Sequence, residues 1–303
     1  MPQQPTRRYE ALSYTWGDPS VTDAIRCSQT GRELLVTVNC KNALRRLRFP
    51  HQRRWLWIDA ICINQQDIRE RELQVGRMGE IYKAAEGVLV YLGDEAEGGT
   101  HAMNYLRSIE TRNQTWDGPL SLQLHEALRA LMRRPWFGRI WILQEVYNAK
   151  SAVVICGPAS VGWGALLLYK WWHRLGRRDF DSWPLVMSLK DQTVYNSRGL
   201  LDFLIKARSC GATDARDRVY ALLPMLQGWR TEGIPGPDYS ISQEQAFVRV
   251  ATYLCRRGLA VFTAVSHRPN MSQDWHSPRL PSWVPTGATM TTACPSGPTP
   301  AGP

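Results

Sequence analysis

The sequence predicts an α/β fold with a short, mostly parallel sheet flanked by helices, followed by a mainly helical C-terminal region. Two observations support this prediction. Residues 54–94 show a buried strand, a helix and a second buried strand, which is the order of a parallel crossover. After about residue 175, the remaining patterns are mostly helical.

Short apolar runs give the strand predictions. "RWLWIDAICI" (54–63) is apolar on both faces apart from Asp59, as expected for a strand covered by helices on both sides. Asp59 therefore needs a buried partner or a functional role, because an unpaired buried charge is costly. Three further strands are expected at 9–15 ("YEALSYT"), 87–94 ("GVLVYLGD") and 151–157 ("SAVVICG").

Capping residues locate the helices. Asp67 followed by Glu70 predicts a capping box for a helix that ends near Ala84, and Asn39 and Ser242 are expected to be N-caps of two more helices. β-rich runs on both sides of Thr30-Gly31 predict a hairpin. Other helical patterns cover about 101–111, 121–133, 138–148 and 162–174.

Length and composition indicate a globular protein with three regions. The 303 residues are 44% hydrophobic, which is enough for one large domain or two ordinary ones. Residues 1–175 are expected to form the α/β core, and residues 176–265 a mainly helical extension. Residues 266–303 are rich in Pro, Ser, Thr and Gly, and we expect a disordered tail there.

Several classes of protein are disfavoured by composition. The seven cysteines are scattered without a C-x-x-C pair and the six histidines without an H-x-x-x-H pair, which argues against a disulfide framework or a metal site. No P-loop motif appears. No apolar run approaches the roughly 18 residues of a membrane span, and residues 1–10 lack an apolar targeting core. We expect a cytoplasmic protein without a membrane segment.

The charge balance leaves a nucleic-acid-binding protein as a remote alternative. The 37 basic and 27 acidic residues give a formal charge of +10. However, the Arg pairs are spread along the chain, without aromatic interleaving or a recognisable recognition helix. A solvated basic surface is the simpler interpretation.

The stretch "WFGRIWILQEVY" (136–147) combines apolar residues with one carboxylate, Glu145. In a helix, Trp141 and Glu145 would be i,i+4 neighbours opposite an apolar arc. Two interpretations stay open. Glu145 either lines a pocket together with the Trp141 indole, or it is a surface acid that pairs with Arg134 or Arg139.

Three stretches together resemble the fungal heterokaryon incompatibility (HET) domain. They are "YEALSYTWGD" (9–18), "LWIDAICINQQDIRERELQVGRMGEIYKAAEGVLVYLGD" (56–94) and "RRPWFGRIWILQEVYNAKSAVVICG" (133–157). The resemblance implies a role in non-self recognition and regulated cell death after fusion of incompatible fungal cells. HET domains are more distantly similar to TIR domains, which implies a TIR/flavodoxin-like core.

Some TIR domains hydrolyse NAD with a helical Glu that follows a Trp in a W-x-x-x-E pattern. Trp141 and Glu145 reproduce that spacing, so the resemblance implies a catalytic Glu145 with Trp141 beside it. A positioned carboxylate stabilises the oxocarbenium character that develops when a glycosidic bond breaks. In this hypothesis NAD is the substrate, and no cofactor is required.

The carboxyl ends of parallel strands supply the expected nucleotide-binding residues. In open α/β sheets, ligands bind beyond these ends. The residues expected there are Trp16, Gly17, Asp18 and Asn64, with Arg139 as a positive charge for phosphate. Asn64 and the adjacent Gln65 are equally typical of a strand-to-helix turn.

The sequence thus supports two classes of function. One is a TIR-like NAD glycohydrolase that depends on Glu145. The other is a non-enzymatic interaction module that self-assembles or binds protein partners through the HET domain, in which Glu145 pairs with an arginine. The direction that the Glu145 side chain faces distinguishes them.

Overall fold

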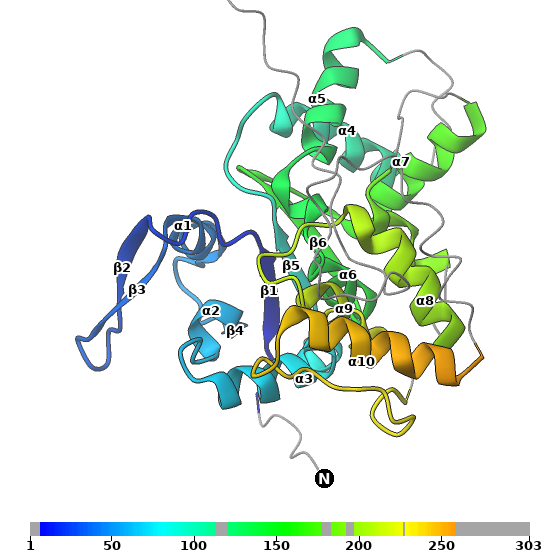
Figure 1. The fold of residues 1–303 in the computed structure, drawn as a ribbon. Helices are drawn as coiled ribbons and strands as arrows, with labels where there is room; N and C mark the ends of the chain where they lie inside the picture. The colour runs from blue at the N-terminus through cyan, green and yellow to red at the C-terminus, as the bar shows by residue number, and fades with distance from the viewer. Residues whose placement is uncertain (1–6, 113–119, 177–182, 192–196, 227, 259–303) are drawn as a thin grey trace, which may run out of the picture.

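A five-stranded sheet lies at the centre of the fold (Figure 1). The computed structural model describes residues 7–112, 120–176, 183–191, 197–226 and 228–258, so the tail expected at 266–303 lies outside the described residues. The strands, in spatial order, are β4 (Leu56–Trp57), β1 (Glu10–Tyr14), β5 (Val88–Tyr91), β6 (Ala152–Cys156) and β7 (Ala159–Gly162). The pairs β4–β1, β1–β5 and β5–β6 are parallel, and β7 is antiparallel to β6. This confirms the expected α/β class with a mostly parallel sheet.

Alternate residues of β1 face two different cores. Leu12 and Tyr14 pack in a smaller core with α1 (Val38–Leu47), and Ala11 packs in a larger core on the other face of the sheet. The larger core includes α3 (Ile68–Ala84) and continues into the C-terminal helices. Helices therefore cover both faces of the sheet, and Ser13 of β1 is buried on the same side as Ala11.

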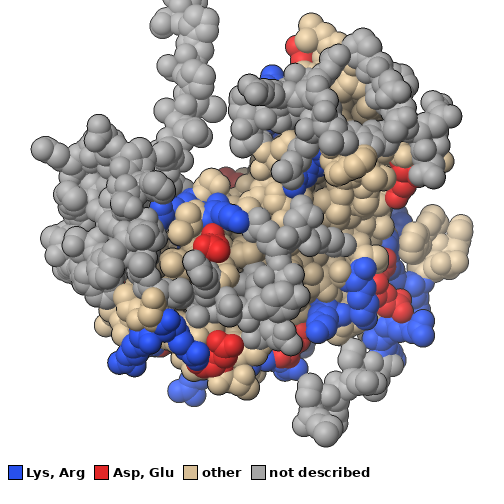
Figure 2. Space-filling model, turned by 90° about the vertical axis from the view of Figure 1, so that its right-hand side faces the viewer, with Lys and Arg blue, Asp and Glu red and all other residues tan. Residues whose placement is uncertain are grey.

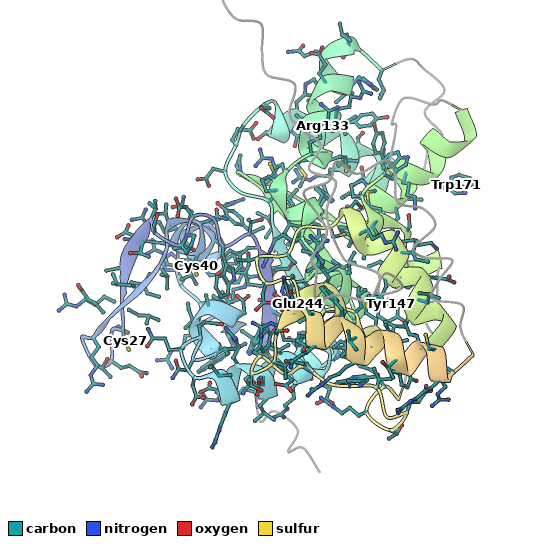
Figure 3. All side chains as sticks on the ribbon, viewed as in Figure 1. Cys27, Cys40, Arg133, Tyr147, Trp171 and Glu244 are labelled. Atoms are coloured by element: carbon teal, nitrogen blue, oxygen red, sulfur yellow. The ribbon has the colours of Figure 1, made fainter. Side chains whose placement is uncertain are left out.

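The predicted hairpin is confirmed. Strands β2 (Thr22–Arg26) and β3 (Glu33–Thr37) pair antiparallel in a separate two-stranded sheet. Gly31 has a φ of +68°, a backbone conformation that glycine adopts without steric cost. The hairpin projects beyond α1, with Cys27 near its outer end (Figure 3).

The single strand expected at 54–63 is wrong over most of its length. Strand β4 covers only Leu56–Trp57, and the short helix α2 (Asp59–Cys62) follows. The reason is Asp59, whose carboxylate accepts hydrogen bonds from its neighbour's amide, Ala60, and from the Trp16 indole, both at 2.8 Å. The chain turns at the position where a buried carboxylate needs these donors.

Two capping predictions need correction and one is confirmed. Thr37, and not Asn39, caps α1, because the Asn39 side chain donates to the Thr15 carbonyl instead. Asp67 caps α3 as expected. However, the Glu70 carboxylate accepts a hydrogen bond from the backbone N–H of Asn64 at 3.1 Å and not from that of Asp67, so the capping box is incomplete. At α10 (Gln243–Arg256), Ser242 forms the full capping box.

The helix expected at 138–148 is shorter than predicted. The 3-10 helix η1 (Pro135–Gly138) comes first, and α6 covers only Ile142–Tyr147. Between them, the Ile140 amide donates to the Gly211 carbonyl at 3.0 Å, which leads the chain out of a helical path. The other helices before residue 177 agree with the patterns: α4 (Gly99–Arg112), α5 (Leu122–Met132) and α7 (Trp163–Gly176).

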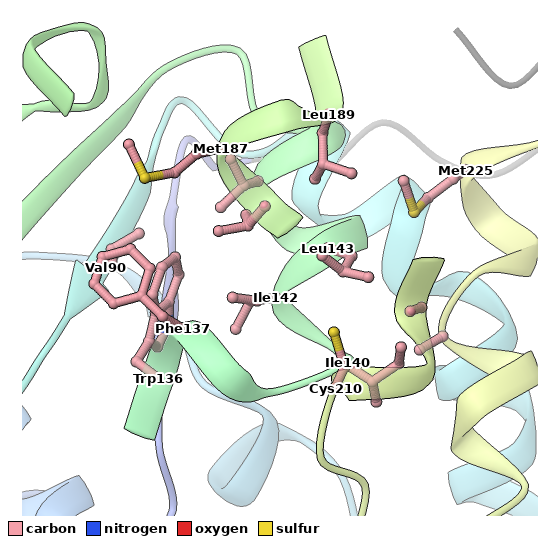
Figure 4. Close-up of a cluster of buried hydrophobic side chains, with 14 of the residues drawn as sticks. Val90, Trp136, Phe137, Ile140, Ile142, Leu143, Met187, Leu189, Cys210 and Met225 are labelled. Carbon is pink, nitrogen blue, oxygen red and sulfur yellow. The ribbon is translucent and has the colours of Figure 1, made fainter. Parts of the chain in front are cut away.

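The C-terminal extension packs directly on α6. It contains α8 (Ser197–Lys206), α9 (Asp217–Tyr220), α10 and the 3-10 helices η2 (Leu185–Asp191), η3 (Ala207–Ser209) and η4 (Leu223–Met225). Figure 4 shows Ile142 and Leu143 of α6 within one cluster with Met187, Leu189 and Met225 of the extension. One core thus includes residues from both sides of the predicted boundary at 175, and that boundary stays a prediction. Within the described ranges, no helix has both the length and the apolar character of a membrane span.

Two leucines of α5 test the depth of this core. Leu128 is fully buried, whereas Leu122 is 73% exposed on the same helix. We expect Leu128→Ala to lower the free energy of unfolding by about 2–5 kcal/mol and Leu122→Ala to change it by less than about 0.5 kcal/mol. Urea unfolding followed by circular dichroism measures both, and equal effects would contradict the packing of α5 described above.

Candidate functional site

Glu145 lies on α6, and its carboxylate is buried between α6 and β1. The residue is 2% exposed, and its Oε2 accepts a short hydrogen bond from the Ser13 hydroxyl of β1. Ser13 in turn accepts a hydrogen bond from the Trp136 indole N–H at 2.8 Å. The Tyr82 hydroxyl, which donates to the Leu12 carbonyl at 3.0 Å, also lies beside the carboxylate. Ser13 and Tyr82 therefore lie beside the Glu145 carboxylate near the end of β1, and Trp136 holds the Ser13 hydroxyl.

Burial changes the acidity of Glu145. Loss of water around the carboxylate raises the pKa of Glu145 to about 7, although the nearby Arg139 guanidinium and the Ser13 hydroxyl act in the opposite direction. The carboxyl group can thus hold or release a proton near neutral pH. Such a value suits a general acid or base, and it equally suits a structural carboxyl group that is neutral for part of the physiological range.

Arg139 links Glu145 to a second carboxylate, Asp59. The Arg139 guanidinium donates to the Tyr14 carbonyl at the end of β1, and its charge lowers the pKa of both acids. Burial nevertheless raises the pKa of Asp59 above its usual range. The Trp16 indole donates to Asp59 at 2.8 Å, so Trp16, Asp59, Arg139 and Glu145 form one cluster at the carboxyl end of β1.

Trp141 belongs to a different cluster. Its indole N–H donates to Asp217 Oδ2 at 3.1 Å, and the Tyr239 hydroxyl donates to Asp217 Oδ1 at 2.6 Å. Asp217 is 8% exposed, and burial raises the pKa of Asp217 to about 6. The Arg71 guanidinium lies 4.2 Å from the centre of the Tyr239 ring. Trp141 is therefore bound to the C-terminal extension.

Side chains of the protein itself occupy the carboxyl ends of the central strands. The Asn39 amide donates to the Thr15 carbonyl after β1, and the Asn42 amide donates to Asp94 after β5 at 3.2 Å. Arg134 donates to the carbonyls of Leu92 and Asp94 at 3.1 and 2.7 Å. These polar groups serve to hold the loops at the sheet edge where ligands commonly bind in open α/β folds.

The structure brings only part of the expected site together. Arg139, Glu145 and Trp16 lie in one cluster, while Trp141 contacts Asp217. Gly17 has a φ of +80° in the exposed loop after β1.

Asp18 and Asn64 make contacts close to their own positions. Asp18 accepts from the Ser20 amide and hydroxyl at 2.8 and 2.7 Å, and Asn64 accepts from the Gln66 amide at 3.2 Å. Both side chains thus stabilise turns in this structure. For Asn64, this agrees with the interpretation as part of a strand-to-helix turn.

Sequence reasoning missed Ser13, Tyr82 and Trp136 as neighbours of Glu145. Ser13 interrupts an otherwise apolar strand, and a polar residue at a buried strand position is the signal that indicates a buried partner. Asp217 is a further buried polar residue that sequence reasoning missed. Its burial depends on Tyr239 and Trp141, which lie 22 and 76 residues away in sequence, so no local pattern reveals it.

One buried polar side chain next to Glu145 has no hydrogen-bond partner in the structure. Gln144 is 0% exposed, and neither its Oε1 nor its Nε2 is hydrogen-bonded. Such a group lowers the stability of the fold around α6. Over the described ranges, no group of three or more His, Cys, Asp or Glu side chains has an arrangement that could hold a metal ion.

The comparison with known families gives a match in the amino-terminal part of the chain. Residues 9–145 match the family model described as heterokaryon incompatibility protein (HET). Over this segment the chain is similar to HET proteins. The matched segment begins just before β1 and ends at Glu145, so the Ser13–Glu145 hydrogen bond joins its two ends.

The chain is also similar to a curated fungal protein. It is 26% identical over 366 aligned positions to "Heterokaryon incompatibility protein 6, OR allele" of Neurospora crassa. The alignment covers 94% of this chain and 54% of the relative, so the chain spans about half the length of that protein. No solved structure matches this chain.

The raised pKa of Glu145 gives the first test of this site. A carboxyl group with a pKa of about 7 in the folded protein and near 4.5 when unfolded favours the folded state below about pH 4.5, and this contribution is lost as the pH rises to about 7. We expect the wild type to lose on the order of 3 kcal/mol of unfolding free energy relative to Glu145→Gln across this window. Urea unfolding at several pH values measures the difference. The exposed Glu126→Gln is the control, and a pH-independent difference for Glu145→Gln would contradict the burial of this carboxylate.

The second test concerns Asp217. Asp217→Ala leaves the Trp141 indole and the Tyr239 hydroxyl without their shared acceptor, so we expect a loss of about 2–4 kcal/mol in the free energy of unfolding. Asp217→Asn keeps one acceptor oxygen and should lose less. Asp202→Ala, at an exposed position on α8, should change the value by less than about 0.5 kcal/mol. Equal values for Asp217→Ala and Asp202→Ala would show that the cluster contributes nothing to stability.

Proposed function

We propose that this HET-domain protein acts in fungal heterokaryon incompatibility as a non-enzymatic signalling module for non-self recognition and regulated cell death. The module works in the cytoplasm, associates with itself or with protein partners through the HET domain, and needs no cofactor. The HET match over residues 9–145 and the similarity to a Neurospora crassa incompatibility protein support the biological role.

The enclosure of Glu145 is the observation that favours a module over an enzyme. A glycohydrolase carboxylate has to reach the sugar carbon at which the bond breaks. Glu145 is 2% exposed, and its carboxylate is hydrogen-bonded to Ser13. In this arrangement Glu145 holds α6 against β1, and Arg139 compensates its charge when it ionises.

The contacts at the sheet edge support the same conclusion. A phosphate-binding loop presents free backbone N–H groups or a free guanidinium to its ligand. Here Arg134 and Arg139 both donate to backbone carbonyls of the loops after β5 and β1. Arg139, the cation expected to bind the nucleotide, therefore stabilises the protein's own chain, and so does Arg134.

TIR-like NAD cleavage is the second candidate, and a specific observation favours it. Within the central sheet, the strands follow the order 2-1-3-4-5 when they are numbered along the chain, which is the order of flavodoxin-like folds. The Glu145 carboxyl group, which has a pKa of about 7, lies near the carboxyl end of β1. In this candidate NAD is the substrate and Glu145 the catalytic carboxylate, with Trp141, Trp16, Gly17, Asp18, Asn64 and Arg139 at the site.

Catalysis requires a rearrangement of α6 that exposes the carboxylate. The Trp141–Asp217 hydrogen bond and the pairing of Gly138 and Ile140 with Gly211 oppose such a rearrangement. The second candidate therefore needs a trigger that weakens the contact between α6 and the extension. The module requires no exposure of Glu145.

Expression of the wild type and of Glu145→Gln in a fungal host tests the proposal. We expect the wild type to arrest growth without loss of cellular NAD, and Glu145→Gln to arrest growth as well, because glutamine can still accept the Ser13 hydrogen bond. Growth rate and NAD content are measured in the same cultures, with Glu126→Gln as the control at an exposed position.

The two candidates give different results in this experiment. NAD loss with the wild type that is absent with Glu145→Gln would overturn the module and support the enzyme. Thermal unfolding of purified Glu145→Gln shows whether a lost phenotype reflects a lost fold. Wild-type protein that neither arrests growth nor consumes NAD when the fungal partner strain is present would overturn both candidates.

A further inference from the structure

The amino-terminal edge of the central sheet is rich in positive charge. Because β1, β4, β5 and β6 are parallel, the segments that lead into them lie at one edge. Backbone hydrogen bonds of 2.9–3.0 Å connect these segments, from Glu10 to Trp55, from Glu86 to Tyr9 and from Val88 to Ser151. The basic residues that the topology collects at this edge are Arg7, Arg8, Arg53, Arg54, Lys83 and Lys150.

Few acids balance these charges. Residues 45–55 contain five arginines and no Asp or Glu. Glu10 pairs with Arg54 at 2.5 Å, and Glu86 pairs with Arg8 at 3.3 Å. Within the described part of the chain, no carboxylate forms an ion pair with the other basic residues of this surface, which are Arg7, Arg48, Arg53, Lys83 and Lys150.

Two exposed aromatic rings lie among these arginines. Phe49 is 46% exposed and Trp55 is 49% exposed. The Arg54 guanidinium lies 4.5 Å from the centre of the Phe49 ring, and the Arg7 guanidinium lies 4.5 Å from the centre of the Trp55 ring. We call residues 7–8 and 48–55, together with Lys83 and Lys150, the basic edge.

The composition of the basic edge differs from other parts of the surface. Figure 2 shows the face on the side of α7 and α8, where Lys and Arg side chains lie next to Asp and Glu side chains. On α3, Glu80 pairs with Arg230, and in the extension Arg249 pairs with Asp238. At these two positions an adjacent acid balances the positive charge.

We propose that the basic edge binds the surface of an anionic phospholipid bilayer. Each Lys or Arg near such a surface favours binding, and arginine forms bidentate hydrogen bonds with lipid phosphate. Trp and Phe rings insert at the level of the headgroups, where an apolar body and polar surroundings are both accommodated. The basic edge supplies both kinds of side chain on neighbouring segments.

Nucleic acid is a less suitable ligand for the same surface. Single-stranded nucleic acids stack their bases on the faces of aromatic rings. In the basic edge, a guanidinium already lies over one face of Phe49 and one face of Trp55. The two rings are thus better arranged to insert partly among lipid headgroups than to stack on nucleic-acid bases.

Vesicle co-sedimentation of the full chain tests the proposal. We expect binding to vesicles of 70% phosphatidylcholine and 30% phosphatidylserine and little binding to pure phosphatidylcholine. Raising the salt from 0.1 to 0.5 M should weaken binding, because the Debye length falls below about 5 Å. Arg7→Gln combined with Arg53→Gln should reduce the partition coefficient roughly fivefold for each arginine removed.

Matched variants separate the basic edge from general surface effects. Phe49→Ser combined with Trp55→Ser removes the exposed rings and should reduce binding at both salt concentrations. The control combines Leu122→Ser and Arg133→Gln on and beside α5, which lies at the opposite end of the molecule from α3 (Figures 1 and 3). We expect the control variant to bind as the wild type does.

Four results would overturn the proposal. The first is that the wild type binds equally to both vesicle compositions. The second and third are that the basic-edge variants bind as the wild type does, or that the control variant loses as much binding as they do. The fourth is that the protein binds a labelled 20-nucleotide DNA under conditions where it does not bind the anionic vesicles. Because none of these readouts involves NAD or growth arrest, failure here leaves the proposed function intact.

Discussion

The hydrogen bond between Ser13 and Glu145 is the constraint on which the rest of the structure depends. It connects the first strand of the sheet with α6 across 132 residues of chain, and both residues are buried. A buried carboxylate is tolerated only when donors and a nearby cation compensate its charge. Ser13 and Arg139 meet that need for Glu145, and in doing so they determine where α6 lies relative to β1.

The C-terminal extension completes this arrangement. Its apolar side chains cover the outer side of α6, and Asp217 accepts hydrogen bonds from both Trp141 and Tyr239. The HET match ends at residue 145, yet the segment that carries Glu145 is packed against η2 and η4 of the extension. The matched segment and the extension therefore share one core around α6.

Much of the fold could be predicted from sequence because its signals are local. Apolar runs located β1, β5 and β6, and the caps at Asp67 and Ser242 located two helices. The errors occur where a distant side chain decides the local structure. Asp59 ends β4 early because its carboxylate has Trp16 as a partner, and Asn39 leaves the capping role to Thr37 because it bonds to Thr15. For the site, the spacing of Trp141 and Glu145 placed them one helical turn apart, but it could not indicate that they contact different parts of the protein.

The packing of α6 also has a consequence for synthesis of the protein. Ile142 and Leu143 leave the ribosome before the residues that cover them, which extend to Met225. At about 5–20 residues per second, translation of the intervening chain takes on the order of ten seconds. During that interval the newly made sheet and α6 present uncovered apolar side chains, so nascent chains of this protein are natural clients for ribosome-associated chaperones.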